Sequence, residues 1–290
     1  MYYLLLAFIY PLSLLPLWVL YRLSDLAYFL LYHVTGYRKD VVRDNLSHAF
    51  PQKTEAEREL ILRRFYRSFC DQWIETIKLL SISKRALSRR FDGNWEVFQD
   101  LGREGKNTFA MLGHTYNWEW ANAVCPIHSP QPYYCVYLPL SSKSFDRLML
   151  RIRSRTGAKM VSMKALKSGL AAMQAESPYI LALAADQNPS VTETALWLSF
   201  MNREAPFFRG GEAMARRAKG AVVFAGIRKV RRGYYRIELT RAFDDASQAA
   251  AGDVTRAYAR FVEAQLEAQP ENYLWSHRRW KHVRKTVTTG

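Results

Sequence analysis

A histidine and an acid frame the stretch of this sequence with the most potential for chemistry, residues 113–119. His114 follows the apolar run 108–112, and Glu119 lies where the next helix can begin. If His114 is in the turn and Glu119 on the first helical turn, the carboxylate orients the imidazole through one ring nitrogen. The other nitrogen is then available to take a proton from a hydroxyl. The spacing alone fits equally well a core histidine that is satisfied by a backbone carbonyl.

The elements around this stretch alternate between strands and helices. Short β-prone apolar runs are found at 108–112, 133–138, 179–185, 221–227 and 234–239. Helical patterns are found at 118–124, 143–156, 164–176, 211–219 and 254–268. This alternation predicts an α/β fold with a mostly parallel central sheet flanked by helices.

Polar clusters follow three of the predicted strands. They are Gly113-His114, then Asp186 with Gln187 and Asn188, and then the basic segment 228–232. Such sheets place their functional groups at the carboxyl ends of the strands. Asp186 and Gln187 therefore bind polar groups of a substrate, brace the site, or are plain turn residues.

A long helix is predicted before the sheet. Thr54-Glu55-Ala56-Glu57 is typical of a capping box. The apolar positions after it, at spacings of three and four, form an amphipathic stripe, which we interpret as core: Leu62, Phe65, Phe69, Trp73, Ile77 and Leu80.

The N-terminus is predicted to anchor the chain to a membrane. Residues 1–21 have no charged side chain, and roughly 20 apolar residues are enough to span a bilayer. Pro11 and Pro16 also favour a monotopic anchor lying in one leaflet, and a hydrophobic helix in a soluble core is the third alternative. Arg22, Arg38 and Lys39 favour a cytoplasmic location for the rest of the chain. We therefore expect an anchor at 1–35 and an α/β domain at 36–290.

Composition narrows the class of partner. The chain has 42 Lys and Arg against 26 Asp and Glu, a net charge of +16, which indicates an anionic partner such as lipid, nucleic acid or an acidic protein. No nucleic-acid-binding motif is present. The three cysteines are Cys70, Cys125 and Cys135; they form no C-x-x-C pair and favour a reducing compartment. No matched set of metal ligands is visible, so we predict no metal.

Four segments together resemble the lipid A biosynthesis (late) acyltransferase family. His114 with Glu119 resembles the H-x4-D/E motif of glycerolipid and lipid A acyltransferases. The alternate arginines before Gly157 resemble an Arg-x-Arg-x-Gly segment, and Asp186-Gln187 resembles an Asp-Gln or Asp-His segment. The tail PENYLWSHRRWK, residues 270–281, resembles the family's Pro-Glu-x-Tyr-x-Trp-x-His-Arg-Arg signature. Leu138 departs from the Tyr-Arg-Pro that members often have, which leaves the substrate contact at that position open.

The resemblance covers nearly the whole chain and implies an O-acyltransferase. Such an enzyme moves a fatty acyl chain from acyl carrier protein to a hydroxyl of a lipid A precursor, in lipopolysaccharide biosynthesis at the cytoplasmic face of the inner membrane. It implies His114 as general base and Glu119 as the group that orients it, with no cofactor. The residues then assigned to substrate binding are Arg153, Arg155, Asp186, Gln187, Arg278 and Arg279.

Several alternatives stay open at this point. The acceptor can be another glycolipid or an aminolipid, or the chain can be a non-catalytic basic protein that binds membranes or nucleic acid. Arg153 and Arg155 also fit a basic helix face lying on an anionic membrane. The tail aromatics, Trp275 to Trp280, suit a membrane interface or packing on the sheet with only the arginines exposed.

Overall fold

The computed structural model describes residues 1–189 and 191–284. Its helices are α1 (Tyr2–Leu14), α2 (Leu17–Phe29) with a π-helical extension (Leu30–Thr35), α3 (Lys39–Ala49), α4 (Glu55–Lys78), α5 (Lys84–Ser88), α6 (Glu96–Arg103), α7 (Trp118–His128), α8 (Lys143–Ser154), α9 (Leu166–Ala175), α10 (Gly210–Arg217) and α11 (Asp253–Ala268). Its strands are β1 (Phe91–Gly93), β2 (Thr108–Leu112), β3 (Tyr133–Tyr137), β4 (Lys159–Ser162), β5 (Ile180–Ala184), β6 (Leu196–Phe200), β7 (Arg203–Phe207), β8 (Ala221–Arg231) and β9 (Tyr234–Phe243).

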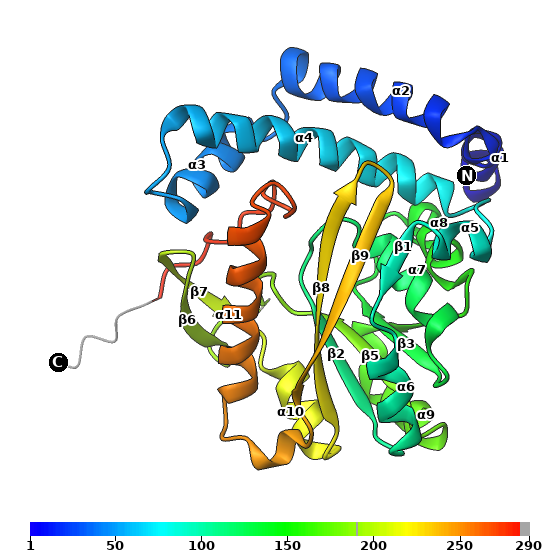
Figure 1. Cartoon of the computed structure of the whole chain (residues 1–290), viewed down its shortest axis with the longest axis vertical. Helices are drawn as coiled ribbons and strands as arrows, with labels where there is room; N and C mark the ends of the chain where they lie inside the picture. Colours follow the sequence, from blue (N-terminus) through cyan, green and yellow to red (C-terminus); the bar gives the residue numbers. More distant parts are fainter. Residues whose placement is uncertain (190, 285–290) are drawn as a thin grey trace.

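A seven-stranded sheet lies at the centre of the molecule, in the order β1-β9-β8-β2-β5-β3-β4 (Figure 1). The strands from β8 to β4 are parallel to one another, whereas β9 is antiparallel to β8 and β1 is parallel to β9. Strands β6 and β7 form a separate antiparallel ribbon. The predicted α/β fold with a mostly parallel sheet is therefore confirmed.

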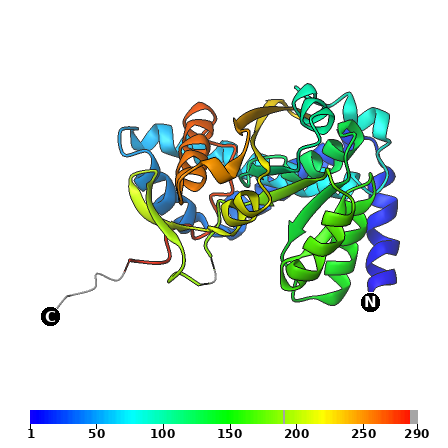
Figure 2. The ribbon, with the colours of Figure 1, turned by 90° about the horizontal axis from the view of Figure 1, so that it is seen from below.

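Both faces of the sheet are buried, which explains why its strands are continuous apolar runs. On β2, Phe109 and Met111 pack into one core with side chains of α11, whereas Ala110 packs into a second core with side chains of α7. In Figure 2 α11, in orange, lies on one side of the strands. Because β2 and β5 are adjacent and parallel, the residues that follow them meet at the same edge.

Helix α4 begins with the predicted capping box, in which Thr54 and Glu57 bond reciprocally. The prediction that its apolar stripe is core is wrong at Trp73, which is 48% exposed. Asp71 and Glu75 are buried instead. The stripe shifts here because this part of α4 faces a polar network rather than an apolar core.

The N-terminal helices lie along α4, with α1 also against α8 (Figure 1). No single helix in the described part of the chain is long and apolar enough to cross a bilayer. Helix α1 and the segment Leu17–Thr35 satisfy these criteria only as a pair, bent by 117°. Large apolar side chains point to solvent on both, among them Phe8 (80% exposed) and Trp18 (71%).

Two predicted segments take different positions from those expected. The tail aromatics Trp275 and Trp280 are buried in the core and do not form a membrane interface: Trp275 packs on Phe50, which follows α3, and Trp280 stacks on Phe200 of the β6–β7 ribbon. The basic segment 228–232 does not follow β8 as a loop. It forms the end of β8 and the tip of the β8–β9 hairpin, because the strand continues well past its apolar part.

Candidate active site

His114 and Asp186 form the polar pair at the edge where β2 and β5 end. The His114 Nδ1 atom lies 2.7 Å from Asp186 Oδ1, and the His114 backbone N–H donates to Asp186 Oδ2 at 2.9 Å. The Asp186 side chain is fully buried, and the His114 side chain is 20% exposed. The imidazole therefore has one end fixed by the protein and keeps some access to solvent.

The charge of Asp186 decides which nitrogen of His114 has the proton. Burial by itself raises the pKa of the Asp186 carboxyl, but the adjacent His114 ring and backbone N–H groups outweigh burial and hold this pKa at about 2. An ionised carboxylate can only accept hydrogen bonds, so the His114 Nδ1 atom is the donor. The Nε2 atom of the neutral ring then has its lone pair available, as a general base requires.

The prediction that Glu119 orients His114 is wrong in its geometry. The Glu119 carboxylate accepts from Arg153 Nε at 2.9 Å and from Arg153 Nη2 at 2.5 Å, a bidentate ion pair that is mostly buried. Glu119 lies in the first turn of α7 and points to α8, whereas His114 precedes that helix. Trp118 lies between them: its ring is edge-on to His114 at 5.3 Å, and its Nε1 donates to Glu119 at 3.1 Å.

The predicted substrate-binding arginines of α8 have partners within the protein. Burial by itself lowers the pKa of Arg153, but the Glu119 charge outweighs burial and raises it, so this guanidinium stays charged. Arg155 follows α8 and donates to the carbonyl of Ile82, away from the His114–Asp186 pair. Neither the ion pair nor the contact with Ile82 was predictable from the alternate spacing of the arginines.

The C-terminal tail packs directly on the segment that contains His114. The Leu274 N–H donates to the His114 carbonyl at 3.2 Å, and Thr115 forms an antiparallel bridge with Tyr273. The Tyr116 N–H donates to Asn272 Oδ1 at 3.1 Å. Residues 272–274 thus hold the turn after β2 in place.

The two tail arginines have different environments. Arg279 is 1% exposed and donates from Nη1 to Asn188 Oδ1 at 2.9 Å, with its guanidinium 4.4 Å from the centre of the Phe207 ring. Arg278 is exposed, and its carbonyl accepts from Asn188 Nδ2 at 2.8 Å. Asn188 therefore joins the tail to the turn that contains Asp186 and the half-buried Gln187.

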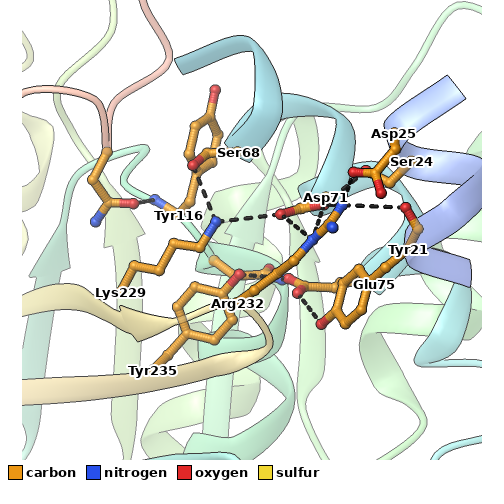
Figure 3. Close-up of polar contacts among 12 residues, drawn as sticks. Tyr21, Ser24, Asp25, Ser68, Asp71, Glu75, Tyr116, Lys229, Arg232 and Tyr235 are labelled. Carbon is orange, nitrogen blue, oxygen red and sulfur yellow. Dashed lines mark hydrogen bonds and ion pairs between the residues drawn. The ribbon is translucent and has the colours of Figure 1, made fainter. Parts of the chain in front are cut away.

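A fully buried carboxylate, Glu75 of α4, supports the start of α7 and did not stand out in the sequence (Figure 3). Its two oxygens accept from Tyr21 at 2.7 Å, from Asn117 Nδ2 at 2.7 Å and from Tyr235 at 2.6 Å. Asn117 Oδ1 caps α7 by accepting from the Trp120 N–H at 3.0 Å. The Asn117 amide is therefore buried and occupied by contacts within the protein.

A cavity of about 490 Å³ opens between the start of α10 and the segment that follows Asp186 and Gln187. Its lining is mostly apolar and includes Met163, Pro189, Val191, Ala195 and Phe208, but Arg209, Glu212 and Arg216 also line it. The apolar part of this lining suits a hydrocarbon chain. Among residues 1–189 and 191–284, no three or more His, Cys, Asp or Glu side chains are grouped so as to hold a metal ion.

Comparison with known proteins identifies the family. The family model described as bacterial lipid A biosynthesis acyltransferase matches residues 1–282. The chain belongs to this family. This acyltransferase is 24% identical over 253 residues to a lipid A biosynthesis palmitoleoyltransferase of Escherichia coli K12, covering 84% of this chain and 79% of the relative. It is also 24% identical over 251 residues to a lipid A biosynthesis acyltransferase of Haemophilus influenzae, covering 84% and 76%.

Proposed function

We propose that this acyltransferase moves a fatty acyl chain from acyl carrier protein to a hydroxyl of a lipid A precursor. The observation that supports this most directly is the His114–Asp186 pair, with Nδ1 and Oδ1 2.7 Å apart and the ring partly exposed. A neutral imidazole fixed at one nitrogen by an ionised carboxylate is a competent base for a hydroxyl. Family membership narrows the acceptor to lipid A chemistry.

We propose that the acyl transfer at the His114–Asp186 pair proceeds in two steps. The acceptor hydroxyl gives its proton to the His114 Nε2 atom while its oxygen attacks the thioester carbonyl carbon. A carbon–oxygen bond forms, the carbon–sulfur bond then breaks, and the leaving thiolate takes the proton back from His114. Asp186 stabilises the charged imidazolium between these two steps. We propose that the acyl chain lies in the apolar cavity beside α10.

The net charge of the chain supports acyl carrier protein as the donor. A chain at +16 attracts an acidic carrier protein and speeds its encounter. Raising the salt concentration should therefore increase KM for acyl carrier protein more than it lowers kcat, because charge contacts are screened over about 10 Å at 0.1 M. The measurement is a donor titration at two ionic strengths, beside the same acyl group on coenzyme A. Equal use of the coenzyme thioester with no salt effect would exclude the carrier protein as the specific donor.

We place the protein at the cytoplasmic face of the inner membrane, with α1 and α2 lying in one leaflet. The support is the exposed apolar surface of these helices, which includes Phe8, Trp18 and Leu26. An amphipathic segment lies in the interface with its apolar face about 5–10 Å deep. The basic residues that follow the apolar stretch favour the cytoplasmic side.

The base assignment is tested by His114→Ala and Asp186→Asn. Each should lower kcat by on the order of 10²–10⁴ while the protein stays folded. The first variant removes the base, and the second removes the carboxylate that fixes the tautomer of His114. His48→Ala, at the end of α3 where the histidine side chain is 42% exposed, is the matched control and should be fully active. Mass spectrometry of total lipids should find one acyl group added by the wild type and none by the two variants. Full activity in a folded His114→Ala protein would exclude His114 as the general base.

A further inference from the structure

The inner face of the β8–β9 hairpin tip has a matched set of charges. Lys229 Nζ lies 3.3 Å from Asp71 Oδ2, and Arg232 Nη2 lies 2.7 Å from both Asp71 Oδ1 and Asp25 Oδ1 (Figure 3). Asp71 belongs to α4 and Asp25 to α2. These ion pairs hold the hairpin tip beside α2 and its exposed apolar surface.

The outer face of the same hairpin has an excess of positive charge. Arg228 and Arg236 lie opposite each other in the strand register. Their nearest carboxylates, Glu238 and Asp92, are each 3.9 Å away and are 54% and 74% exposed. The charged residues that line a hollow of about 300 Å³ on this face are five arginines and one carboxylate: Arg89, Arg90, Arg228, Arg231, Arg236 and Asp92. Ion pairs this exposed neutralise little of the arginine charge.

Two of these arginines are held in place by one aromatic ring. The guanidinium of Arg231 lies 3.8 Å from the centre of the Tyr234 ring, and that of Arg90 lies 4.7 Å from it. Arg90 Nη1 also donates to the Gly233 carbonyl at 3.4 Å. Less side-chain entropy is therefore lost when the two guanidinium groups bind an anion. Forked guanidinium groups bind phosphate bidentately.

The hollow adjoins α2 at Gly233. This glycine has φ +73°, and a Cβ atom there would lie 2.2 Å from the Tyr21 hydroxyl and 3.3 Å from Arg90 Nη1. Tyr21 is in the first half of α2, so the hairpin meets this helix along its side. When α2 lies in the acyl boundary of a bilayer, a cationic hollow at its side is at the depth of the phosphate groups.

We propose that this arginine hollow binds the phosphate groups of anionic bilayer lipids and fixes how the enzyme is oriented on the membrane. The inference deepens the proposed membrane attachment and rests on it. A lipid surface fits better than an acidic protein for two reasons. Val230 at the hairpin tip is 60% exposed and apolar, and the Arg232–Asp25 ion pair joins the tip to α2, whose exposed side chains include Trp18 and Leu26.

The test measures binding of the full-length protein to phosphatidylcholine vesicles prepared with and without phosphatidylglycerol. The variant Arg228→Gln/Arg231→Gln/Arg236→Gln removes three charges from the hollow. Its affinity for vesicles with phosphatidylglycerol should fall by on the order of 10²-fold, because each basic residue near an anionic surface contributes about fivefold. Its affinity for pure phosphatidylcholine should not change, since α1 and α2 are intact.

The matched control removes three charges elsewhere, in Arg103→Gln/Arg217→Gln/Lys219→Gln. These residues are exposed and belong to α6 and to the end of α10, away from α2 (Figure 1). An equal loss in both triple variants would mean that only net charge matters, and would overturn the proposal. It would also be overturned if the hairpin variant bound vesicles normally but had a raised KM for acyl carrier protein, which would make the hollow a protein-docking site. Vesicle binding requires no acyl transfer, so failure of the proposed reaction is a separate result.

Discussion

At the scale of single residues, His277 is a half-buried titratable group close enough to His114 and Asp186 to be affected by their charges. Burial lowers the pKa of His277 to about 4, although the Asp186 carboxylate favours its charged form; His114 and Arg279 act in the same direction as burial. The unfolded chain therefore binds a proton at His277 below about pH 6.5, and the folded protein does so only below about pH 4. The contribution of His277 to the free energy of unfolding is therefore complete above about pH 6.5 and is lost as the pH falls to about 4.

We predict that the free energy of unfolding falls by up to about 3 kcal/mol from His277 between about pH 6.5 and about pH 4. In His277→Gln this part of the pH dependence should be absent. Denaturant unfolding of both proteins across that range measures the difference. Parallel curves for wild type and variant would contradict the prediction.

The Glu119–Arg153 pair gives a second prediction at this scale. Glu119→Gln should lower the free energy of unfolding by about 3 kcal/mol, because it leaves a largely buried guanidinium without its counter-charge. Adding Arg153→Met should recover most of this loss, since the pair is then replaced by neutral groups. A thermodynamic cycle of the two single variants and the double variant measures it. If Glu119→Gln kept the stability of the wild type but lost much of its kcat, Glu119 would instead take part in the reaction.

The sequence singled out His114, Asp186 and Glu119, but it assigned Glu119 to orient the histidine, whereas Asp186 contacts it. A motif spacing gives proximity along the chain, and Glu119 is only five residues from His114. Strand order decides the matter, because β2 and β5 are neighbours and bring Asp186 to His114. That adjacency depends on pairing between distant segments, which no local pattern encodes.

At the scale of elements, Glu75 joins α2, α4, α7 and β9 through one carboxyl group. Burial raises the pKa of Glu75, and Asp71 adds to this. Glu75→Gln should stay within about 1 kcal/mol of the wild type, because the amide oxygen can accept from Asn117 and Tyr235 while its nitrogen donates to Tyr21. Glu75→Leu should cost at least about 3 kcal/mol, since two buried donors and the part-buried Tyr21 lose their acceptor.

The measurement is the unfolding midpoint of the two Glu75 variants, with kcat determined for each. Equal destabilisation by glutamine and leucine would show that an ionised carboxylate is required there. The sequence did not predict this network. The 3.6-residue pattern of α4 identifies an apolar stripe, but it does not identify polar residues that are buried with partners from other elements.

At the scale of the whole molecule, the strands β2, β3, β5, β8 and β9 and the helices α7 to α11 were predicted to within a few residues. Four of these strands are parallel and buried, so they are apolar runs in the sequence, whereas β9 is antiparallel and alternates buried with exposed residues. The short strands β1 and β4 and the β6–β7 ribbon were missed, since three to five residues give little periodicity. The N-terminal anchor stays a prediction. Its length suggested a span, whereas the structure breaks it into two helices at the Leu15-Pro16 step.

The proposed attachment predicts the effect of removing apolar surface. Phe8→Ser/Trp18→Ser should weaken binding to phosphatidylcholine vesicles by on the order of 10²-fold or more, because burying one such side chain contributes about 1.5–3 kcal/mol. Val283→Ser is a control, since this residue is 84% exposed and lies in the tail. Vesicle flotation measures both. Normal flotation of the double variant would exclude α1 and α2 as the principal attachment.

The contact between the tail and the turn after β2 has a consequence for the order of events during synthesis. Tyr116 and its partner Asn272 are 156 residues apart. A growing chain emerges N-terminus first, so α1 and α2 leave the ribosome long before residues 272–274 can support His114. The nascent protein can thus reach a bilayer while its catalytic centre is still unfinished. A translation product that stops short of the tail would retain the apolar helices and lack a braced histidine.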